Sequence, residues 1–152
     1  MPLTELRLVM AANEYASTGF NIFNFNGATE EYLVEATDLK GPGVIRSGQI
    51  ALRAAERAEC FDWKLRPDAL PLLDNRPLPV RPGENRQVWA IVKTENQGPG
   101  KYSGELRLKR GKAGYAVRLE VEVLPVKLPA AMPIRTYNWG YLNFAPVAAD
   151  VK

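Results

Sequence analysis

The side chains in this sequence that are best suited to hold a ligand are aromatic. Trp63 lies in an irregular stretch, and Tyr137, Trp139 and Tyr141 occupy alternate positions near the C-terminus. Alternate residues of an extended segment share one face, so these last three could form a flat platform. Sugar rings stack on flat indole and phenol surfaces. The four residues are therefore candidates for carbohydrate binding. The alternative is that they pack against this domain or a neighbouring one.

Residues suited to catalysis are scarce. The chain contains no histidine, which removes the commonest general base and the commonest zinc ligand. Glu30 and Glu31 are adjacent carboxylates, but neighbours on a strand point to opposite faces, and we expect both in a solvated turn after Asn26-Gly27. Ser17 and Ser47 have no histidine to activate them. We predict that the chain is not an enzyme and uses no metal or cofactor.

Composition narrows the class of partner. The 152 residues carry a net charge of +3, with 46% hydrophobic and 24% charged residues, as in ordinary globular domains. Acidic and basic residues are interspersed, as in Arg118-Leu119-Glu120, so we expect no nucleic-acid partner. No stretch approaches the roughly 18 apolar residues of a membrane span. The single cysteine excludes an internal disulfide, and a domain of this length needs none.

The elements that must position these side chains are β-strands. Val88–Leu124 indicates three consecutive strands, of which the last two alternate strictly between apolar and polar residues. We expect a central hairpin with a neighbouring strand. In the last strand one face carries Val117, Leu119, Val121 and Val123.

The N-terminal part predicts a strand over Leu3–Met10 and a polar connection over Asn13–Thr18. Gly19–Phe25 is aromatic and β-branched, which favours a strand. Asn26-Gly27 is a strong turn signal, and Glu31–Thr37 predicts the returning strand. We therefore expect a hairpin here.

The middle of the chain is less regular. Gln49–Arg53 predicts a short strand that runs into a loop ending at Cys60. Phe61–Gly83 is rich in proline, which excludes a central strand, so we expect a long connection across one end or edge. The side chains expected to pin it are Trp63, Leu65, Leu70, Leu72 and Leu73.

These elements predict an all-β fold, an antiparallel two-sheet β-sandwich that is immunoglobulin- or fibronectin-like in the broad sense. We expect residues 1–129 to form this sandwich. Residues 130–152 would be an exit linker or the start of a following, truncated domain. Their unpaired apolar residues would permit a dimer of the excised fragment.

Three motifs are similar to those of a known family. They are Asn13-Glu14-Tyr15 with Phe20–Asn24, Val88–Val92 with Pro99-Gly100-Lys101-Tyr102-Ser103-Gly104, and Val121–Leu124 with Leu128-Pro129. Together they resemble the N-terminal β-sandwich domain that precedes the catalytic barrel in bacterial glycoside hydrolases resembling family 123, and in related barrel proteins of unknown function. The likeness covers about residues 10 to 140.

The resemblance implies a non-catalytic accessory domain that braces its own C-terminal catalytic barrel, which would carry the catalytic acids. The alternative is a carbohydrate-binding module whose aromatic platform binds a polysaccharide. A parent protein of this kind would be secreted or periplasmic. Residues 1–5 have no basic signal-peptide region, so such a parent would have lost its leader.

The second motif has a plain physical basis. Pro99 and Gly100 make a turn, and Tyr102 takes the first inward position of the next strand. Gly104 faces the same side, and we expect it to leave room for Trp89. The motif is therefore a folding device, and we predict no direct binding role for it.

Overall fold

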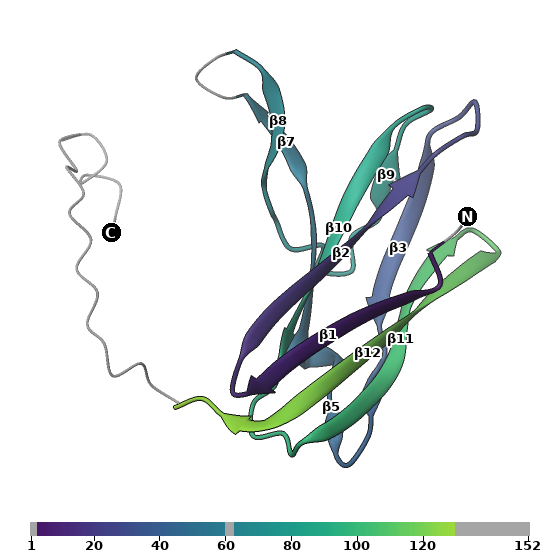
Figure 1. The fold of residues 1–152 in the computed structure, drawn as a ribbon. Helices are drawn as coiled ribbons and strands as arrows, with labels where there is room; N and C mark the ends of the chain where they lie inside the picture. Colours follow the sequence, from purple (N-terminus) through teal and green to yellow (C-terminus); the bar gives the residue numbers. More distant parts are fainter. Residues whose placement is uncertain (1–2, 60–62, 130–152) are drawn as a thin grey trace, which may run out of the picture.

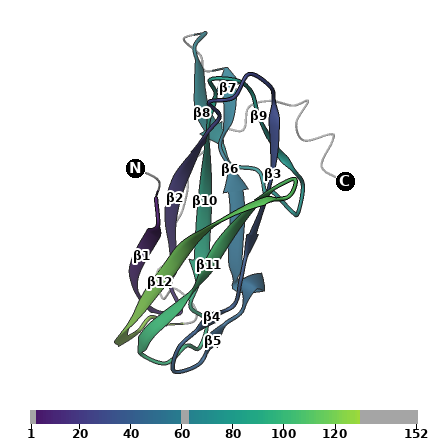
Figure 2. The ribbon, with the colours of Figure 1, turned by 90° about the vertical axis from the view of Figure 1, so that its right-hand side faces the viewer.

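A computed structural model describes residues 3–59 and 63–129 of the chain. These residues form an immunoglobulin-like β-sandwich, in which two sheets pack around one hydrophobic core (Figures 1 and 2). A two-stranded arm projects from one end of the sandwich (Figure 1). The predicted fold class is confirmed.

The larger sheet has the strand order β1-β12-β11-β3-β9, with β4 and β5 attached beside β11. Its strands are β1 (Glu5–Ala12), β3 (Glu30–Ala36), β4 (Leu39–Lys40), β5 (Val44–Ile45), β9 (Leu78–Val80), β11 (Gly100–Arg110) and β12 (Ala113–Lys127). The smaller sheet has the order β2-β10-β6, with β2 (Tyr15–Phe23), β10 (Asn85–Lys93) and β6 (Ile50–Ala54). The arm consists of β7 (Glu56–Glu59) and β8 (Leu65–Ala69), and a 3-10 turn, η1 (Ser47–Gln49), precedes β6. Paired strands are antiparallel except β1 and β12, which run parallel. Among the described residues, no helix has the length and apolar character to cross a membrane.

The core lies where the alternation of the strands brings apolar side chains together. On β12 the predicted inward face is confirmed, with Val117, Leu119, Val121 and Val123 all buried. From the smaller sheet, Val88, Ala90 and Val92 of β10 face them and are fully buried. Burial of each valine or leucine stabilises the fold by roughly 1.5–3 kcal/mol, so these central strands hold the two sheets together.

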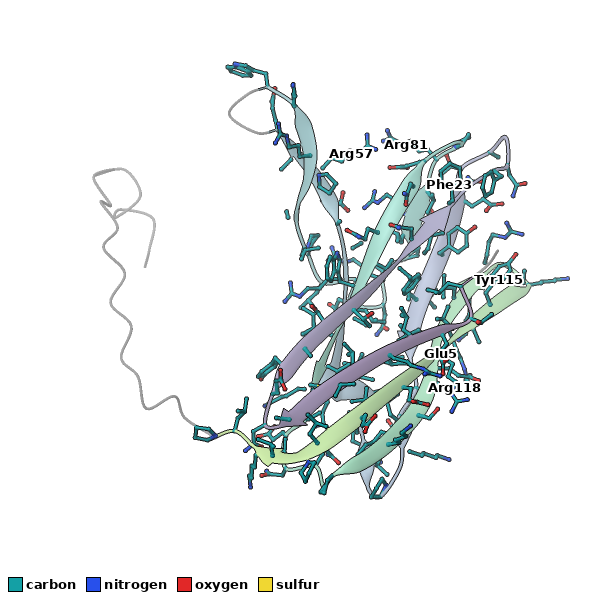
Figure 3. The ribbon with its side chains drawn as sticks, in the orientation of Figure 1. Glu5, Phe23, Arg57, Arg81, Tyr115 and Arg118 are labelled. Atoms are coloured by element: carbon teal, nitrogen blue, oxygen red, sulfur yellow. The ribbon has the colours of Figure 1, made fainter. Side chains whose placement is uncertain are left out.

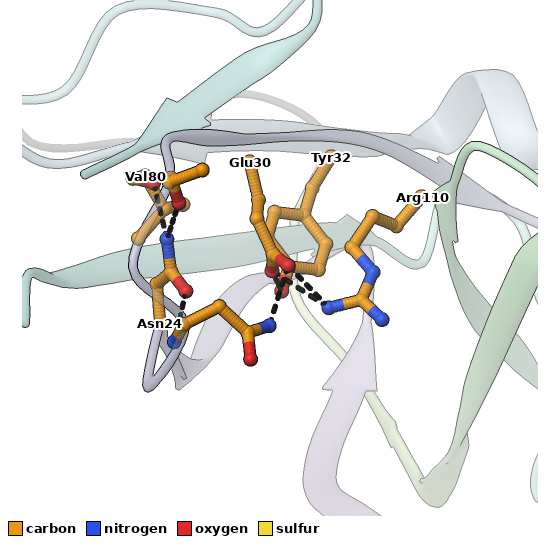
Figure 4. Close-up of polar contacts among 7 residues, drawn as sticks. Asn24, Glu30, Tyr32, Val80 and Arg110 are labelled. Carbon is orange, nitrogen blue, oxygen red and sulfur yellow. Dashed lines mark hydrogen bonds and ion pairs between the residues drawn. The ribbon is translucent and has the colours of Figure 1, made fainter. Parts of the chain in front are cut away.

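The predicted N-terminal hairpin does not form. β2 pairs with β10 in the smaller sheet, whereas β3 pairs with β11 and β9 in the larger sheet. The chain crosses between the sheets at buried Asn24, whose amide donates to the carbonyls of Ala28 at 2.8 Å and Val80 at 2.9 Å (Figure 4). Its Oδ1 atom accepts from the N–H of Asn26 at 2.8 Å. These hydrogen bonds satisfy backbone carbonyl and N–H groups where the chain crosses from one sheet to the other. Asn26-Gly27 therefore lies in a connection between two sheets and not in a hairpin.

β2 also begins earlier than the sequence predicts. Residues 15–18, expected in a polar connection, pair with β10 from Ala90 to Lys93. These residues fit a strand because Tyr15 and Ser17 face outward and are exposed, whereas Ala16 packs against the core.

The segment predicted as three consecutive strands does form three strands, but the first two do not form a hairpin. β10 lies in the smaller sheet, and the hairpin is made by β11 and β12 in the larger sheet. Tyr102 is fully buried as predicted, and its hydroxyl donates to the carbonyl of Gly98 at 2.8 Å. Gly104 does not make room for Trp89. A Cβ at Gly104 would lie 2.7 Å from the carbonyl oxygen of Asp38, so the glycine accommodates the segment that leads into β4.

The proline-rich stretch covers an edge, as predicted. The N–H of Ala54 donates to the carbonyl of Pro71 at 3.3 Å, and the N–H of Leu73 donates to the carbonyl of Leu52 at 2.9 Å. These bonds protect the free edge of β6. The stretch also contains β8 and β9, and β9 is an edge strand, which is where a proline such as Pro79 is tolerated.

The expected pinning of this stretch is only partly correct. Leu73 is buried, but Leu72 is 46% exposed and Trp63 is 83% exposed. The side chain of Leu65 lies outside the described part of the structure. The loop expected up to Cys60 instead forms β7, because residues 56–59 find a partner in β8.

Candidate interaction surfaces

The described chain leaves the sandwich beside the turn between β1 and β2. The N–H of Leu128 donates to the carbonyl of Ala12 at 2.9 Å, and the side-chain amide of Asn13 donates to the carbonyl of Leu128 at 3.0 Å. Buried Thr94 holds the other side of this turn, since its hydroxyl donates to the carbonyl of Ala11 at 2.6 Å. The first and last sequence motifs thus meet, and both have a structural role here.

Apolar side chains are exposed at this end of the sandwich. Tyr15 is 65% exposed, Val126 is 55% exposed and Leu128 is 40% exposed, and we call these three residues the exit-end patch. The ammonium group of Lys93 lies 5.6 Å from the centroid of the Tyr15 ring. Its hydrogen bond to Glu95, at 2.6 Å, raises the pKa of Lys93, so the ammonium stays charged. Exposed apolar residues beside the point where the chain leaves a domain are candidates for contact with another protein segment.

The outer faces of the two sheets differ in charge. The larger sheet carries ion pairs on its outer face, including Arg118 with Glu5 at 3.7 Å (Figure 3). Further pairs join Arg118 to Glu120, Lys101 to Glu120, Arg107 to Glu105 and Lys109 to Glu35. Such a face is suited to contact with water.

The outer face of the smaller sheet is mostly uncharged along its middle strand. Trp89 lies there, half-buried, rather than in the core. It packs over Gly19, where a Cβ would lie 3.4 Å from the indole ring. The indole N–H donates to Oε1 of Gln87, two residues earlier on β10, at 3.1 Å, which restrains the ring. These contacts place the ring on the outer face, so the predicted position of Trp89 beside Gly104 is wrong.

The arm formed by β7 and β8 extends beyond the sandwich (Figure 1). It carries charged and polar side chains such as Glu56, Arg57 and Arg66, and none of its described side chains belongs to the core. Trp63 lies just before β8, with a positive φ of 59° and 83% of its surface exposed. An indole so exposed is available to a ligand or a partner surface.

A cleft of about 570 Å³ opens where the arm leaves the sandwich, and we call it the arm cleft. The arm contributes Glu56, Arg57 and Pro67, and Ala55 precedes it. The sandwich contributes Asn21, Pro79, Arg81, Glu84, Asn85, Arg86 and Gln87. Most of these side chains are charged or amides, so the cleft is suited to a polar ligand.

Arg86 lies deepest among the arginines of the arm cleft, with a side chain that is 14% exposed. Its Nη2 atom donates to Oε1 of Glu56 at 2.5 Å, and its Nη1 atom lies 3.9 Å from Glu84. The buried Nε atom has no hydrogen-bond partner among the described residues. The ion pair between Arg86 and Glu56 connects the first residue of the arm to β10.

An exposed aromatic pair lies near the same end. The rings of Phe23 and Phe25 have centroids 4.4 Å apart and planes tilted by 34°, and the two residues are 45% and 87% exposed. Phe23 is the register partner of Asn85, which lines the arm cleft (Figure 3). Sequence reasoning assigned both phenylalanines to a strand and missed their exposure, because alternation alone does not distinguish an aromatic outer face from a core face.

Glu30 is not solvated as the sequence predicts. Both oxygens of its carboxylate accept from Arg110, at 2.6 and 2.7 Å, and one accepts from the Tyr32 hydroxyl at 2.7 Å (Figure 4). The Asn26 amide donates to it at 2.6 Å. The hydrogen bond from Arg110, followed by that from Tyr32, lowers the pKa of Glu30 to about 2. Glu30 is therefore ionised at neutral pH, which does not suit a general acid. Glu31 is exposed on the opposite face, as alternation predicts.

Of the four predicted ligand-binding residues, the structure describes Trp63 alone. Tyr137, Trp139 and Tyr141 lie outside the described residues, as does the whole predicted exit segment 130–152. Among residues 3–59 and 63–129, no three histidine, cysteine, aspartate or glutamate side chains gather in a way that could hold a metal ion.

No protein-family profile matches the sequence, and no curated protein matches it. Solved structures do match in fold. A family 123 glycoside hydrolase from Clostridium perfringens, studied for glycolipid glycan hydrolysis, matches with a TM-score of 0.74 and 17% identity over 85% of this chain. This chain spans only 24% of that hydrolase. The CupB6 tip adhesin from Pseudomonas aeruginosa matches with a TM-score of 0.52 and 13% identity, over 83% of this chain and 41% of the adhesin. The chain thus has the fold of one part of a larger glycoside hydrolase.

Proposed function

We propose that this chain is a non-catalytic accessory β-sandwich domain of a larger carbohydrate-active protein, in which it braces a catalytic barrel. The observation that carries the proposal is the match to one region of a family 123 glycoside hydrolase, at a TM-score of 0.74 over 85% of this chain and 24% of the hydrolase. The three motifs that resemble the N-terminal domain of such proteins support the same assignment.

The exit end supports this role. An accessory domain has to hold the neighbouring domain where the chain passes from one to the other. Leu128 is hydrogen-bonded to Ala12 and Asn13 at that point, which fixes the direction of the chain. The exit-end patch leaves Tyr15 and Val126 exposed beside it. Contact with a barrel would bury these side chains, with a gain of about 25 cal/mol per Å² of apolar surface.

In this proposal residues 1–129 are the sandwich, and residues 130–152 lead into the barrel, which is the partner of the domain. The parent protein would be secreted or periplasmic. The catalytic carboxylates would belong to the barrel.

The proposal is tested on the protein that the gene encodes beyond codon 152. We expect the reading frame to continue into a barrel that hydrolyses an aryl glycoside, whereas residues 1–152 alone show no hydrolysis. Removal of residues 1–129 should lower the melting temperature of the barrel. A frame that ends at Lys152, or hydrolysis by this chain alone, would contradict the proposal.

A carbohydrate-binding module is the second candidate, and the exposed aromatic residues favour it. Trp63 and the Phe23–Phe25 pair present ring faces to solvent at the arm end of the molecule. Affinity electrophoresis against a panel of polysaccharides tests it. The module hypothesis predicts retardation on at least one polymer that is lost in Phe25→Ala or Trp63→Ala. No retardation on any polymer would rule it out.

A further inference from the structure

The arm cleft holds two arginines whose charge is not neutralised by its own residues. Arg57 belongs to β7 of the arm, and Arg81 follows β9, so two separate elements bring guanidinium groups to one cleft (Figure 3). Neither side chain takes part in an ion pair within the described part of the chain. Glu56 and Glu84 also line the cleft. Glu56 accepts from Arg86 at 2.5 Å, whereas Glu84 accepts from the backbone N–H of Arg81 at 2.9 Å and lies 3.9 Å from Arg86. Three arginines against two glutamates leave the lining with one net positive charge, and neither carboxylate pairs with the guanidinium group of Arg57 or Arg81.

We propose that the arm cleft binds an acidic saccharide, with the carboxylate of a hexuronic acid held by Arg57 and Arg81. A guanidinium group matches a carboxylate through two parallel N–H···O bonds, and charge-assisted bonds of this kind are about twice as strong as neutral ones. Arginine side chains from two elements can approach the carboxylate from two sides.

The rest of the cleft suits the hydroxyl groups of a sugar. Asn21 and Asn85 offer amide donors and acceptors. Gln87 accepts the indole N–H of Trp89 with its Oε1 atom, so its amide NH₂ is directed by that bond and remains a donor. Phe23, the register partner of Asn85, places a 45% exposed ring beside these amides. The volume of about 570 Å³ lies within the range of small-ligand sites, about 300–1,000 Å³.

The position of the arm cleft favours a free ligand over a neighbouring domain. The chain leaves β12 at the end of the sandwich that carries the β1–β2 turn. The arm and the start of β10 lie at the opposite end (Figure 1), and residues of both line the arm cleft. The inference therefore goes beyond the bracing role, and its failure would leave that role untouched.

The test is a titration of the chain at pH 7 followed by amide NMR shifts. The probes are sodium glucuronate, sodium galacturonate, glucose and sodium acetate. We expect at least one uronate to shift the amides of Asn21, Asn85 and Gln87, with a dissociation constant at least tenfold lower than those of glucose and acetate. Arg57→Gln and Arg81→Gln should each raise that constant by about tenfold or more.

Arg107→Gln is the matched control. Arg107 is an exposed arginine on the outer face of the larger sheet, paired with Glu105 at 3.0 Å, and its loss should leave uronate binding unchanged. The inference is overturned if neither uronate shifts the cleft amides, or if acetate binds as tightly as the uronates. It is also overturned if Arg81→Gln keeps the affinity while its spectrum remains that of the folded chain.

Discussion

At the scale of single residues, Glu30 was predicted to lie in a solvated turn, but its side chain connects two strands of the larger sheet. Its carboxylate joins β3 to Arg110 at the end of β11, across the larger sheet. Tyr32 and Asn26 complete the set of donors. Arg110 is 80 residues away in the sequence, and Asn26 lies in the turn before β3. The residues next to Glu30 therefore do not indicate that these partners bind it.

This network makes stability depend on pH in a specific window. The pKa of Glu30 is lowered from 4.5 to about 2, so the folded state binds the proton less readily than the unfolded state. The stabilisation is therefore complete above about pH 4.5 and is lost as pH falls toward 2. Glu30→Gln should lower the melting temperature at pH 7, and the difference from the parent should shrink below pH 4.5.

Glu31→Gln is the control, because Glu31 is the exposed neighbour on the other face of β3. It should change the melting temperature little at either pH. A Glu30→Gln variant as stable as the parent at pH 7, or a difference independent of pH down to 2, would contradict the assignment.

Two glycines of the β11–β12 hairpin provide a second comparison. A Cβ at Gly104 would lie 2.7 Å from both the Asp38 carbonyl oxygen and the Leu39 side chain, whereas one at Gly114 meets nothing within 4 Å. Gly104→Ala should therefore cost about 1–3 kcal/mol of the free energy of unfolding. Gly114→Ala should be neutral or slightly stabilising, and urea denaturation measures both. Equal effects would show that Gly104 has no packing role.

At the scale of elements, the arm and the β4–β5 hairpin differ in what they contribute. Ala54 and Pro71 are hydrogen-bonded at the root of the arm, so a short turn can replace residues 56–69. None of the replaced side chains that the structure describes belongs to the core. We predict that the shortened chain folds with a melting temperature within a few degrees of the parent.

Removal of residues 39–45 should abolish folding, because Leu39 and Ile45 are fully buried. An unfolded armless chain would contradict this division.

The elements also show where sequence reasoning succeeds and where it stops. Period-two alternation identifies β12 and its inward face, because burial of Val117 or Leu119 depends only on the strand itself. Pairing depends on the rest of the fold. Asn26-Gly27 predicts a hairpin, yet β2 and β3 lie in different sheets, since the side chain of Asn24 supports the crossing. The arm was missed because its strands are short and charged, and they pair only with each other.

The same limit applies to the candidate sites. Exposure of Trp63 and of the Phe23–Phe25 pair follows from the arm and the sheet crossing, neither of which the sequence reveals. The arm cleft depends on Arg57 and Arg81 coming together from different elements. The motif around Asn13 could be recognised, but its contact with Leu128 required the fold.

At the scale of the whole molecule, the two ends of the sandwich have different tasks in our account. The arm end is polar and open, and suits a ligand. The exit end is apolar around Tyr15, Val126 and Leu128, and suits a neighbouring domain. The outer face of the larger sheet carries several ion pairs, such as Arg118 with Glu5, and is suited to contact with water.

Hydrogen–deuterium exchange tests the central claim most directly. Exchange is compared between residues 1–152 alone and the longer protein encoded by the continuing reading frame. We predict slower exchange in the longer protein at residues 11–15 and 124–128, with unchanged exchange in the arm. Equal exchange at the exit end in the two proteins would contradict the proposal that this domain braces its neighbour there.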